Sequence, residues 1–556
     1  MAASMESHCI PFREIPHTTK LFASFLEEFG RVSAYYAHPP TAAGIGAAAR
    51  EVQSEVQLDA GVRSKVVDVL REQNQRFARE GKLDSATARN LDRFAAGAVT
   101  IVTGQQVGLF SGPAFSFYKA LSIVRCAEET TRRGIEAVPI FWLATEDHDL
   151  AEVNHSFWNT RSGLARYELP LREEDTGHRA GEVVLGGEIE ALVATAIKSL
   201  EGPGTPEISQ ALRESYTPGE TYGSACGKLM ARLLVGRGII FMDPLDVRLH
   251  RLAAPVYRRA LEEADSLRDE LLARSKELAN AGFHAQVEVA VESTLLFYNV
   301  EGQRQPVRGG KGGFSAGKAT FSREELLAAL EKAPEAFTPS ALLRPIVQDT
   351  LLPTAAYIGG PAEVAYMAQA RVVYDKLLGR MPAIMPRASF TIIEPPIARF
   401  LSQYDLDIRD IFAGPQHLRA KMEQKALPAA LAGRFEESEA ALGKMFQAYE
   451  EPLGRLDSTL LEALHSSERK ILHQIEQLKG KVARAETFRS EVLERHERIL
   501  LDSLYPNRAL QERSLCFLPF LAAQGMELLD NLARLTEIPA SGDASSCADG
   551  HRILTL

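Results

Sequence analysis

The stretch "AVTIVTGQQVGLFSGPAFSFYKALSIVRCAEETTRRGIEAVPIFWLATEDHD", residues 98–149, decides the fold. Its first segment, "AVTIVTG", is a short apolar run and predicts a buried strand. "PAFSFYKALSIVRCAEETTRRG" predicts a helix with proline in its first turn and glycine after its end. "AVPIFWLATEDHD" predicts a second buried strand that runs into four polar residues. A strand, a helix and a strand in this order form a βαβ unit, which implies a parallel sheet with a ligand crevice at the carboxyl ends of its strands.

The loop between the first strand and the helix is rich in glycine. Gly104, Gly108 and Gly112 recur every fourth residue, with Gln105 and Gln106 between the first two. A helix that begins near Gly112 directs free N–H groups and the positive end of its dipole at the crevice, which favours phosphate or carboxylate. The spacing matches neither G-x-G-x-x-G nor a Walker A loop. Two interpretations stay open, an anion-binding loop and a tight turn that needs glycine.

A dense polar cluster, "TEDHDLAEVNH", follows the second predicted strand at residues 145–155. Active sites in such sheets lie at strand ends. Glu146, Asp147, His148 and Asp149 could bind a substrate ammonium, accept a proton or hold a metal. The alternative is a helix N-terminus that Asp147 or Asp149 caps. Capping requires only one or two acids, so the cluster is a candidate site.

A metal site is the second alternative for this cluster. His148, Glu152 and His155 are four and three residues apart, so a helix would place all three on one face. Zinc accepts these ligand types. This set keeps a metal-dependent hydrolase open as an alternative, although we expect no metal site.

The start of the predicted helix has an echo later in the chain. "GPAFSFYKA" from Gly112 and "GPAEVAYMA" from Gly360 share Gly-Pro-Ala, a tyrosine and a final alanine. Both lie where a strand should turn into a helix, which indicates the same local role carried out twice. We expect Gly104–Gly112 and the turn at Gly359, Gly360 and Pro361 to form the floor of the crevice.

Two arginines lie in apolar segments that look like strands. Arg344 is followed by Gln348 and Asp349 in "LLRPIVQD", and Arg387 lies in "IMPRASF". Arginine binds carboxylate or phosphate with two parallel hydrogen bonds. A structural pair between Arg344 and Asp349 explains Arg344 equally well.

Two further polar features have simpler interpretations. Lys119 lies in the first turns of the helix and is a candidate for contact with an anionic cofactor, although a solvated face also explains it. Gln511, Glu512 and Arg513 in "YPNRALQERSLCFLPF" precede an apolar helix, which is typical of a solvated turn.

The composition is that of an ordinary globular protein. The 556 residues are too many for one compact core, and 45% hydrophobic and 24% charged residues exclude a disordered chain. A net charge of −10 argues against extended nucleic acid as a ligand. No apolar segment is long enough for a membrane span. The five scattered cysteines lack a C-x-x-C motif, so we expect unpaired thiols in a reducing cytoplasm.

The C-terminal third has a different pattern. After about residue 400, apolar positions recur at alternating spacings of three and four, as in a coiled coil. A narrow apolar seam flanked by charge favours a coiled coil that joins two chains, and the alternative is a long helix packed on its own domain. The seam begins at Leu461 and continues through Leu464, Glu468, Ile471, Ile475, Leu478, Val482, Ala485, Arg489, Val492, His496 and Ile499. It is imperfect at Glu468, Arg489 and His496, which are not apolar.

Taken together, "TGQQVGLFSGPAFSFYKA", "PIFWLATEDHDLAEVNH", "LLRPIVQDTLLPTAAYIGGPAEVAY", "MPAIMPRASF" and "YPNRALQER" resemble the BshC family. The resemblance spans nearly the whole chain in the same order. It implies an α/β fold with a Rossmann-like parallel-sheet core related to class I aminoacyl-tRNA synthetases, inserted connecting segments, and a C-terminal α-helical coiled-coil domain used for dimerisation. The chain has neither H-I-G-H nor K-M-S-K-S, so no synthetase catalytic residue is carried over.

This resemblance leads us to expect five regions. They are residues 1–160 (N-terminal helices and the first half of the core), 161–220 (an inserted connecting segment), 221–400 (the second half of the core with a further insertion), 401–510 (the coiled-coil domain) and 511–556 (a C-terminal helix and tail).

The resemblance also implies a cytoplasmic, homodimeric cysteine ligase that joins cysteine to glucosaminyl-malate in the last step of bacillithiol biosynthesis. Forming this amide requires an activated carboxyl group, for which we expect ATP. We assign Asp147 and His148 catalytic roles, in orienting the amine and taking its proton, and Lys119 a cofactor contact. A non-enzymatic coiled-coil scaffold remains a further alternative. The residues expected to bind substrate are Gly104, Gln105, Gln106, Gly112, Glu146, Asp149, Gly359, Gly360, Arg344 and Arg387.

Overall fold

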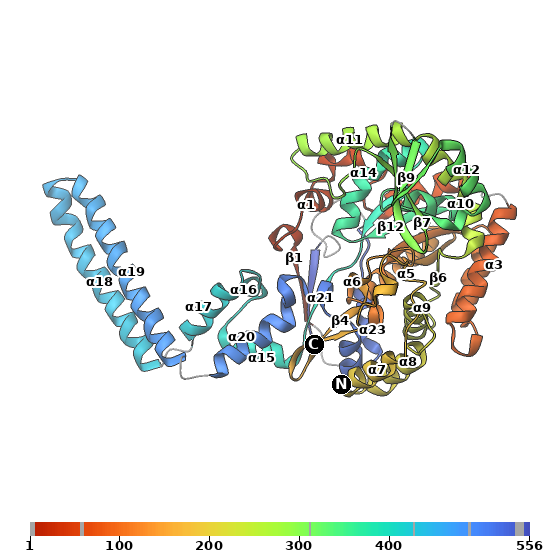
Figure 1. The fold of residues 1–556 in the computed structure, drawn as a ribbon. Helices are drawn as coiled ribbons and strands as arrows, with labels where there is room; N and C mark the ends of the chain where they lie inside the picture. Colours follow the sequence, from red (N-terminus) through yellow and green to blue (C-terminus); the bar gives the residue numbers. More distant parts are fainter. Residues whose placement is uncertain (1–5, 56–59, 311–312, 426–428, 488–490, 540–549) are drawn as a thin grey trace. The chain divides into compact units, whose positions relative to one another are not determined.

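The computed structural model describes residues 6–55, 60–310, 313–425, 429–487, 491–539 and 550–556 (Figure 1). The chain divides into two compact units. The larger unit comprises Ser7–Thr391 and Glu512–Ile553, and the smaller unit is built around Ile392–Gln511. The larger unit is therefore discontinuous in sequence.

A parallel sheet in the order β13-β12-β2-β3-β6 forms the core of the larger unit. Strand β2 pairs with β3 from Val99 opposite Ala137 to Gln105 opposite Leu143, so both strands end at the same edge. Every residue of β3 is buried, as its unbroken apolar run predicts. The Rossmann-like core is thereby confirmed. Its strands are β2 (Val99–Gln105), β3 (Ala137–Leu143), β6 (Ile240–Met242), β12 (Thr354–Gly359) and β13 (Ala383–Pro386).

The predicted βαβ unit is present. Helix α5 (Phe115–Arg132) joins β2 to β3 and packs against both strands. It ends two residues before Gly134, whose φ of 88° lets the chain reverse. Other helices also contact the sheet, α2 (Ala42–Glu55) against β12 and α3 (Ala60–Phe77) against β6. The other helices of this unit before residue 392 are α1 (Lys20–Glu27), α2 (Ala42–Glu55), α3 (Ala60–Phe77), α4 (Ser85–Ala95), α6 (Leu150–Val153), α7 (Glu188–Lys198), α8 (Thr205–Ser215), α9 (Tyr222–Leu233), α10 (Val247–Glu262), α11 (Ala264–Asn280), α12 (Arg323–Lys332), α13 (Arg344–Leu351) and α14 (Pro361–Leu377).

Two insertions extend the core. The first carries the hairpin β4 (His155–Thr160) and β5 (Gly163–Glu168). The second is an antiparallel sheet in the order β10-β9-β8-β7-β11, in which β7 (Ser293–Val300) and β8 (Gln303–Gly310) form the hairpin. The strands that complete it are β9 (Gly313–Ala316), β10 (Ala319–Phe321) and β11 (Phe337–Pro339).

The C-terminal segment returns to the larger unit after Gln511. A further sheet in the order β1-β15-β14 includes strands from both ends of the chain. The elements are α21 (Gln511–Ser514), α22 (Leu518–Gln524), α23 (Glu527–Leu535), β1 (Glu6–Pro11), β14 (Phe390–Ile393) and β15 (Gly550–Thr555).

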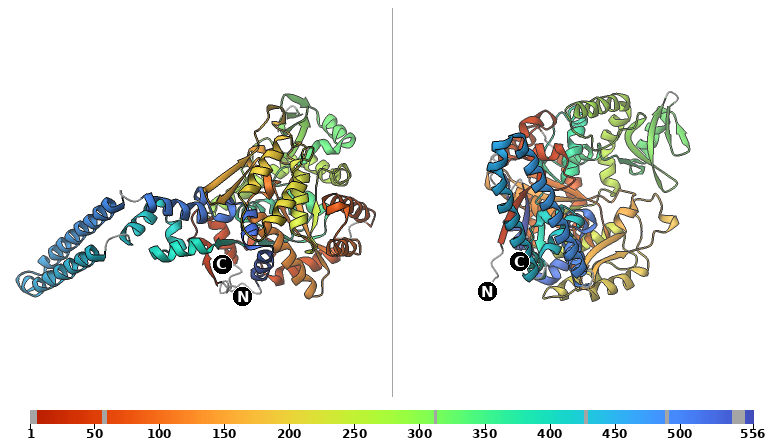
Figure 2. Two further views of the ribbon diagram at one scale, coloured as in Figure 1. Left: turned by 90° about the horizontal axis from the view of Figure 1, so that it is seen from below. Right: turned by 90° about the vertical axis from the view of Figure 1, so that its left-hand side faces the viewer.

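The smaller unit is helical. Helices α18 (Ala429–Leu456) and α19 (Thr459–Thr487) lie side by side (Figures 1 and 2). Glu439 forms an ion pair with Lys479, and Glu450 lies 3.4 Å from His465, so the two helices run antiparallel. This hairpin agrees with the expected coiled-coil domain. The other helices are α15 (Pro395–Tyr404), α16 (Ile408–Phe412), α17 (Pro415–Lys425) and α20 (Glu491–Leu504).

The predicted seam is divided between two helices. Leu464 in α19 is buried, whereas Ile471 is 39% and Leu478 is 51% exposed, so one part of the seam packs within the chain and another faces solvent. His496 belongs to α20, where its Nδ1 lies 2.8 Å from the Tyr404 hydroxyl. Arg489 lies outside the described residues. The homodimer stays a prediction.

Two smaller expectations change. Three buried cysteines, Cys126, Cys226 and Cys516, are free, but Cys9 is disulfide-bonded, so not every thiol is unpaired. Cys547 lies outside the described residues. No helix of the described chain is long and apolar enough to cross a bilayer.

Candidate active site

A cavity of about 660 Å³ opens at the carboxyl ends of β2, β3 and β12. The second insertion contributes Phe297 and Arg304 to its wall. Gly112, His148, Asp149 and Gly359 are not among its lining residues. Those that sequence reasoning selected and that line the cavity are Gly104, Gln105, Gln106, Lys119, Glu146, Asp147, Arg344, Gly360 and Arg387.

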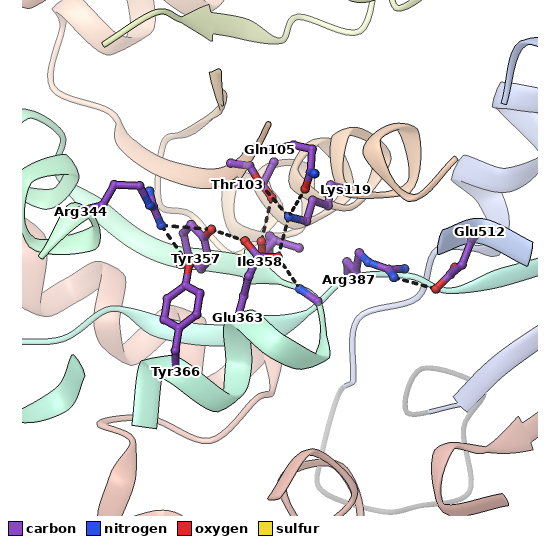
Figure 3. A network of polar contacts seen from close by, with 12 residues as sticks. Thr103, Gln105, Lys119, Arg344, Tyr357, Ile358, Glu363, Tyr366, Arg387 and Glu512 are labelled. Carbon is purple, nitrogen blue, oxygen red and sulfur yellow. Dashed lines mark hydrogen bonds and ion pairs between the residues drawn. The ribbon is translucent and has the colours of Figure 1, made fainter. Parts of the chain in front are cut away.

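Lys119 ties the loop after β2 to helix α14 (Figure 3). Its Nζ donates to the Gly104 carbonyl (2.6 Å) and to Gln105 Oε1 (2.9 Å), and it forms an ion pair with Glu363 Oε2 (2.5 Å). Burial lowers the pKa of Lys119 to about 8, against the attraction of Glu363. An ammonium has three N–H donors, and these three acceptors occupy them. Lys119 is therefore not on a solvated face, and its cofactor contact stays a prediction.

Glu363 caps the second helix of the repeat. Its carboxylate accepts hydrogen bonds from the Gly360 N–H (2.8 Å) and the Tyr357 hydroxyl (2.5 Å). We expected the N–H groups at this turn to face a bound anion. The protein's own carboxylate occupies the Gly360 N–H instead, because glutamate at the third helical position can reach back to the N-cap. At the matching Gly112-Pro113-Ala114 turn, the Ala114 N–H donates to the Leu515 carbonyl.

Amide and hydroxyl groups hold the side chain of Arg344. It begins helix α13, not a strand, with Pro345 in the first turn. Its guanidinium donates to Gln348 Oε1 (2.9 Å) and to the hydroxyls of Tyr357 (3.2 Å) and Tyr366 (3.3 Å). No ion pair joins it to a carboxylate in the described residues. The alternative of an Arg344–Asp349 pair is therefore wrong.

Arg387, in contrast, is paired. Its Nη2 lies 2.6 Å from Glu512 Oε1, and the two side chains are 3% and 0% exposed (Figure 3). Glu512 also accepts from the Ser389 hydroxyl and the Phe390 N–H. The expectation of a solvated turn at residues 511–513 is therefore wrong, because Gln511 and Glu512 are buried and Glu512 pairs with Arg387. Arg513 lines the cavity, and no hydrogen bond to its side chain occurs within the described chain.

Asp147 and His148 are held in place by neighbours. Asp147 accepts hydrogen bonds from Gln106 Nε2 (2.7 Å) and the Asp149 N–H (3.2 Å). Burial would raise the pKa of Asp147, but His148, Gln106 and the Asp149 N–H together hold it well below its usual range. Arg304 Nη1 lies 3.0 Å from His148 Nδ1.

Glu146 is the buried acid of the cluster. It is 7% exposed, and its Oε1 lies 3.7 Å from His250 Nε2. Burial raises the pKa of Glu146 to about 7, although Arg304, Arg179 and Arg344 favour its ionised form. Its pKa and that of Asp147 are therefore pushed apart, which is the pattern of groups with separate acid–base roles.

The metal alternative is wrong. Helix α6 ends at Val153, and His155 begins strand β4, so the three expected ligands do not share a helix face. Glu152 lies against Gln106 Nε2. No group of three or more His, Cys, Asp or Glu side chains in the described chain could hold a metal ion. The physical reason is the segment "HSFWNT", which pairs with β5 as a strand after one helical turn.

The glycine loop is a packed turn. A Cβ on Gly108 would lie 2.9 Å from the Gly112 Cα, so the two backbones approach too closely for a side chain. Gly112 has a φ of 67°, and Phe110 and Ser111 also have positive φ values. Gly104 reaches the cavity, whereas Gly108 and Gly112 shape the turn behind it.

Sequence reasoning missed several residues of the site. Arg304 lies in a polar hairpin without a motif, and His250 lies within an amphipathic helix. Glu363 could have been found from the sequence, because it directly follows the repeated Gly-Pro-Ala motif.

The fold and the site can now be compared with known proteins. A model described as "Bacillithiol biosynthesis BshC, N-terminal Rossmann-like domain" matches residues 5–388, and one described as "Bacillithiol biosynthesis BshC, C-terminal coiled-coil domain" matches residues 390–541. The chain belongs to the BshC family.

Three BshC relatives match along more than nine tenths of their length. The protein of Koribacter versatilis is 40% identical over 99% of both chains, and that of Solibacter usitatus is 34% identical over 99% of this chain and 100% of its own. The protein of Salinibacter ruber is 30% identical over 92% of this chain and 93% of its own. Each carries the description "Putative cysteine ligase BshC". An arginyl-tRNA synthetase structure from Campylobacter jejuni matches with 10% identity and a TM-score of 0.19, covering 87% of this chain and 99% of its own, which is too low to support any inference.

Proposed function

We propose that this chain joins the carboxyl group of cysteine to the amino group of glucosaminyl-malate, in the last step of bacillithiol biosynthesis. The observation that carries the proposal is the charge pattern of the cavity. Arg344 and Arg513 line it and form no ion pair with a carboxylate of the described chain, and Glu146 and Asp147 line it near Arg304. Guanidinium groups suit carboxylate and phosphate, and the acids suit an amine.

The reaction requires an activated cysteine carboxyl group, which ATP would supply as an acyl-adenylate or acyl-phosphate. Arg344 and Arg513 fit the negative charge of such a species better than the helix N-termini do, because the Gly360 N–H is already bonded to Glu363. Lys119 contributes by fixing Gln105 and the Gly104 carbonyl at the cavity edge.

Asp147 and His148 are proposed to orient the amine. Asp147 is ionised at neutral pH, since its pKa is held below the usual range, and an ionised acid attracts the substrate ammonium. A scaffold protein would have no use for these charges, which cost folding free energy when they are buried. We also propose that the protein works as a homodimer in the cytoplasm.

The decisive test is a reconstituted reaction with the purified full chain, cysteine and glucosaminyl-malate, with and without ATP. The expected result is a cysteinyl amide formed only when all three compounds are present. Product formed without ATP would support the ligation reaction and contradict the role of ATP as co-substrate. No product under any condition would contradict the proposed function. Thermal shifts with each compound alone then report whether the cavity binds it.

A further inference from the structure

Glu146 is a buried carboxyl group whose partner is missing from the protein. It lines the cavity and is 7% exposed, yet no described N–H or O–H group donates a hydrogen bond to it. His250 Nε2, at 3.7 Å, is too distant for a good hydrogen bond and is itself buried without one. Buried polar groups are nearly always bonded, so a carboxyl group without a donor at the cavity wall indicates a functional role.

The groups around Glu146 set its chemistry. Arg304, Arg179 and Arg344 favour the ionised form, whereas burial and Asp243 favour the neutral form. The result is a pKa of about 7, where a carboxylate can both take up and release a proton. His250 stays neutral at that pH, because burial lowers its pKa to about 4. Tyr257 is buried beside His250, with its hydroxyl 3.5 Å from Nδ1.

We propose that Glu146 accepts the proton released by the attacking amine, and that His250 is a positioning residue beneath it. This inference rests on the proposed function. The amine nitrogen forms a C–N bond to the activated cysteine carbonyl carbon, and the C–O bond to the phosphoryl leaving group breaks. The leaving group departs with the electron pair of that bond as a phosphate anion. The N–H proton moves to the Glu146 carboxylate and then to water in the cavity.

The test compares Glu146→Gln with Glu173→Gln, a matched control that removes an exposed acid outside the cavity. Two steps are measured across neutral pH, cysteine-dependent ATP consumption and amide formation. We expect amide formation by Glu146→Gln to fall about 100-fold, with cysteine activation retained. The acidic limb of the wild-type pH profile, near pH 7, should disappear. Unchanged amide formation, or an equal loss of both steps, would overturn the proposal.

A second measurement does not depend on the reaction. The folded state holds a proton on Glu146 more tightly than the unfolded state, so this proton stabilises the fold at low pH and the benefit is lost as pH rises through about 7. Glu146→Gln should therefore melt at a higher temperature than wild type above pH 7. Equal melting temperatures at every pH would contradict the buried proton site. If this difference is present but wild type forms no amide, the proposed function fails, and with it the role of Glu146 in that reaction.

The positioning role of His250 has its own readout. His250→Gln should shift the midpoint of the acidic limb while the protein remains folded. An unshifted midpoint would remove His250 from the proposal.

Discussion

The charged residues of the site divide into those that form buried ion pairs and those that are held by uncharged groups. Lys119 with Glu363 and Arg387 with Glu512 are buried ion pairs. Arg344, by contrast, is held by an amide and two phenols, which fix its position without cancelling its charge. Arg344 and Arg387 look alike in the sequence, but only Arg344 presents an unneutralised charge to the cavity.

This difference predicts opposite phenotypes for the two arginines. Arg387→Met leaves Glu512 buried and unpaired, which should destabilise the fold by about 3–5 kcal/mol. Arg344→Met should lower product formation strongly with a much smaller loss of stability. Denaturant unfolding and the ligation assay on both variants measure the contrast. Comparable stability losses would mean that Arg344 is also structural.

Asp147 gives a second prediction at this scale. Asp147→Asn removes the negative charge beside Gln106 and should lower product formation by about 100-fold. Because the low pKa of Asp147 means that its charge also stabilises the fold, we expect a modest fall in melting temperature as well. His148→Ala should behave in the same way. If Asp147 only caps the turn through the Asp149 N–H, the variant will instead lose stability and keep normal turnover.

At the scale of elements, periodicity predicted the core well and the local turns less well. Strands β2 and β3 and helix α5 follow from continuous apolar runs bounded by glycine and proline. The apolar spacing of "TTKLFASFLEEFGRVSAYY" is that of a helix, but α1 ends at Glu27. The apolar spacing arises because Phe25, Phe29 and Tyr36 pack against one another across the following turns, with ring centroids 4.7–6.2 Å apart.

The helical hairpin of the smaller unit carries the prediction of dimerisation. Ile471 and Leu478 are exposed on α19, so replacing both with glutamate should not disturb packing against α18. In a homodimer joined through this face, the double variant would bury charge and dissociate. Light scattering should then give half the wild-type mass with unchanged helical circular dichroism. A wild-type chain that is already monomeric would contradict the prediction.

At the scale of the whole molecule, contacts between distant segments are what the sequence could not reveal. The order of strands and the crevice at their ends follow from connection rules. The pairing of Arg387 with a residue 125 positions later does not, because no local pattern encodes it. The same is true of Arg304 and His250, which reach the site from an inserted sheet and from helix α10.

A buried histidine that contacts a distant segment should make the stability of the larger unit depend on pH. His551 in β15 is fully buried, with Nδ1 2.7 Å from the Ser389 hydroxyl and Nε2 2.8 Å from the Thr391 hydroxyl. Burial lowers the pKa of His551 to about 4, against the attraction of Glu512. The unfolded state therefore binds a proton more readily, and stability should fall as pH drops from about 6.5 towards 4. His551→Gln should lose part of this dependence in melting curves, and an identical slope would contradict it.

The discontinuity of the larger unit has a consequence for its synthesis on the ribosome. Arg387 emerges long before Glu512, its buried partner, and at about 5–20 residues per second the interval of 125 residues lasts roughly 6–25 s. During that time all five strands of the parallel sheet have been translated, but Arg387 in the cavity wall lacks the carboxylate of Glu512. The buried pair of Arg387 and Glu512 therefore forms only after the coiled-coil segment between them has been translated, long after the strands of the sheet.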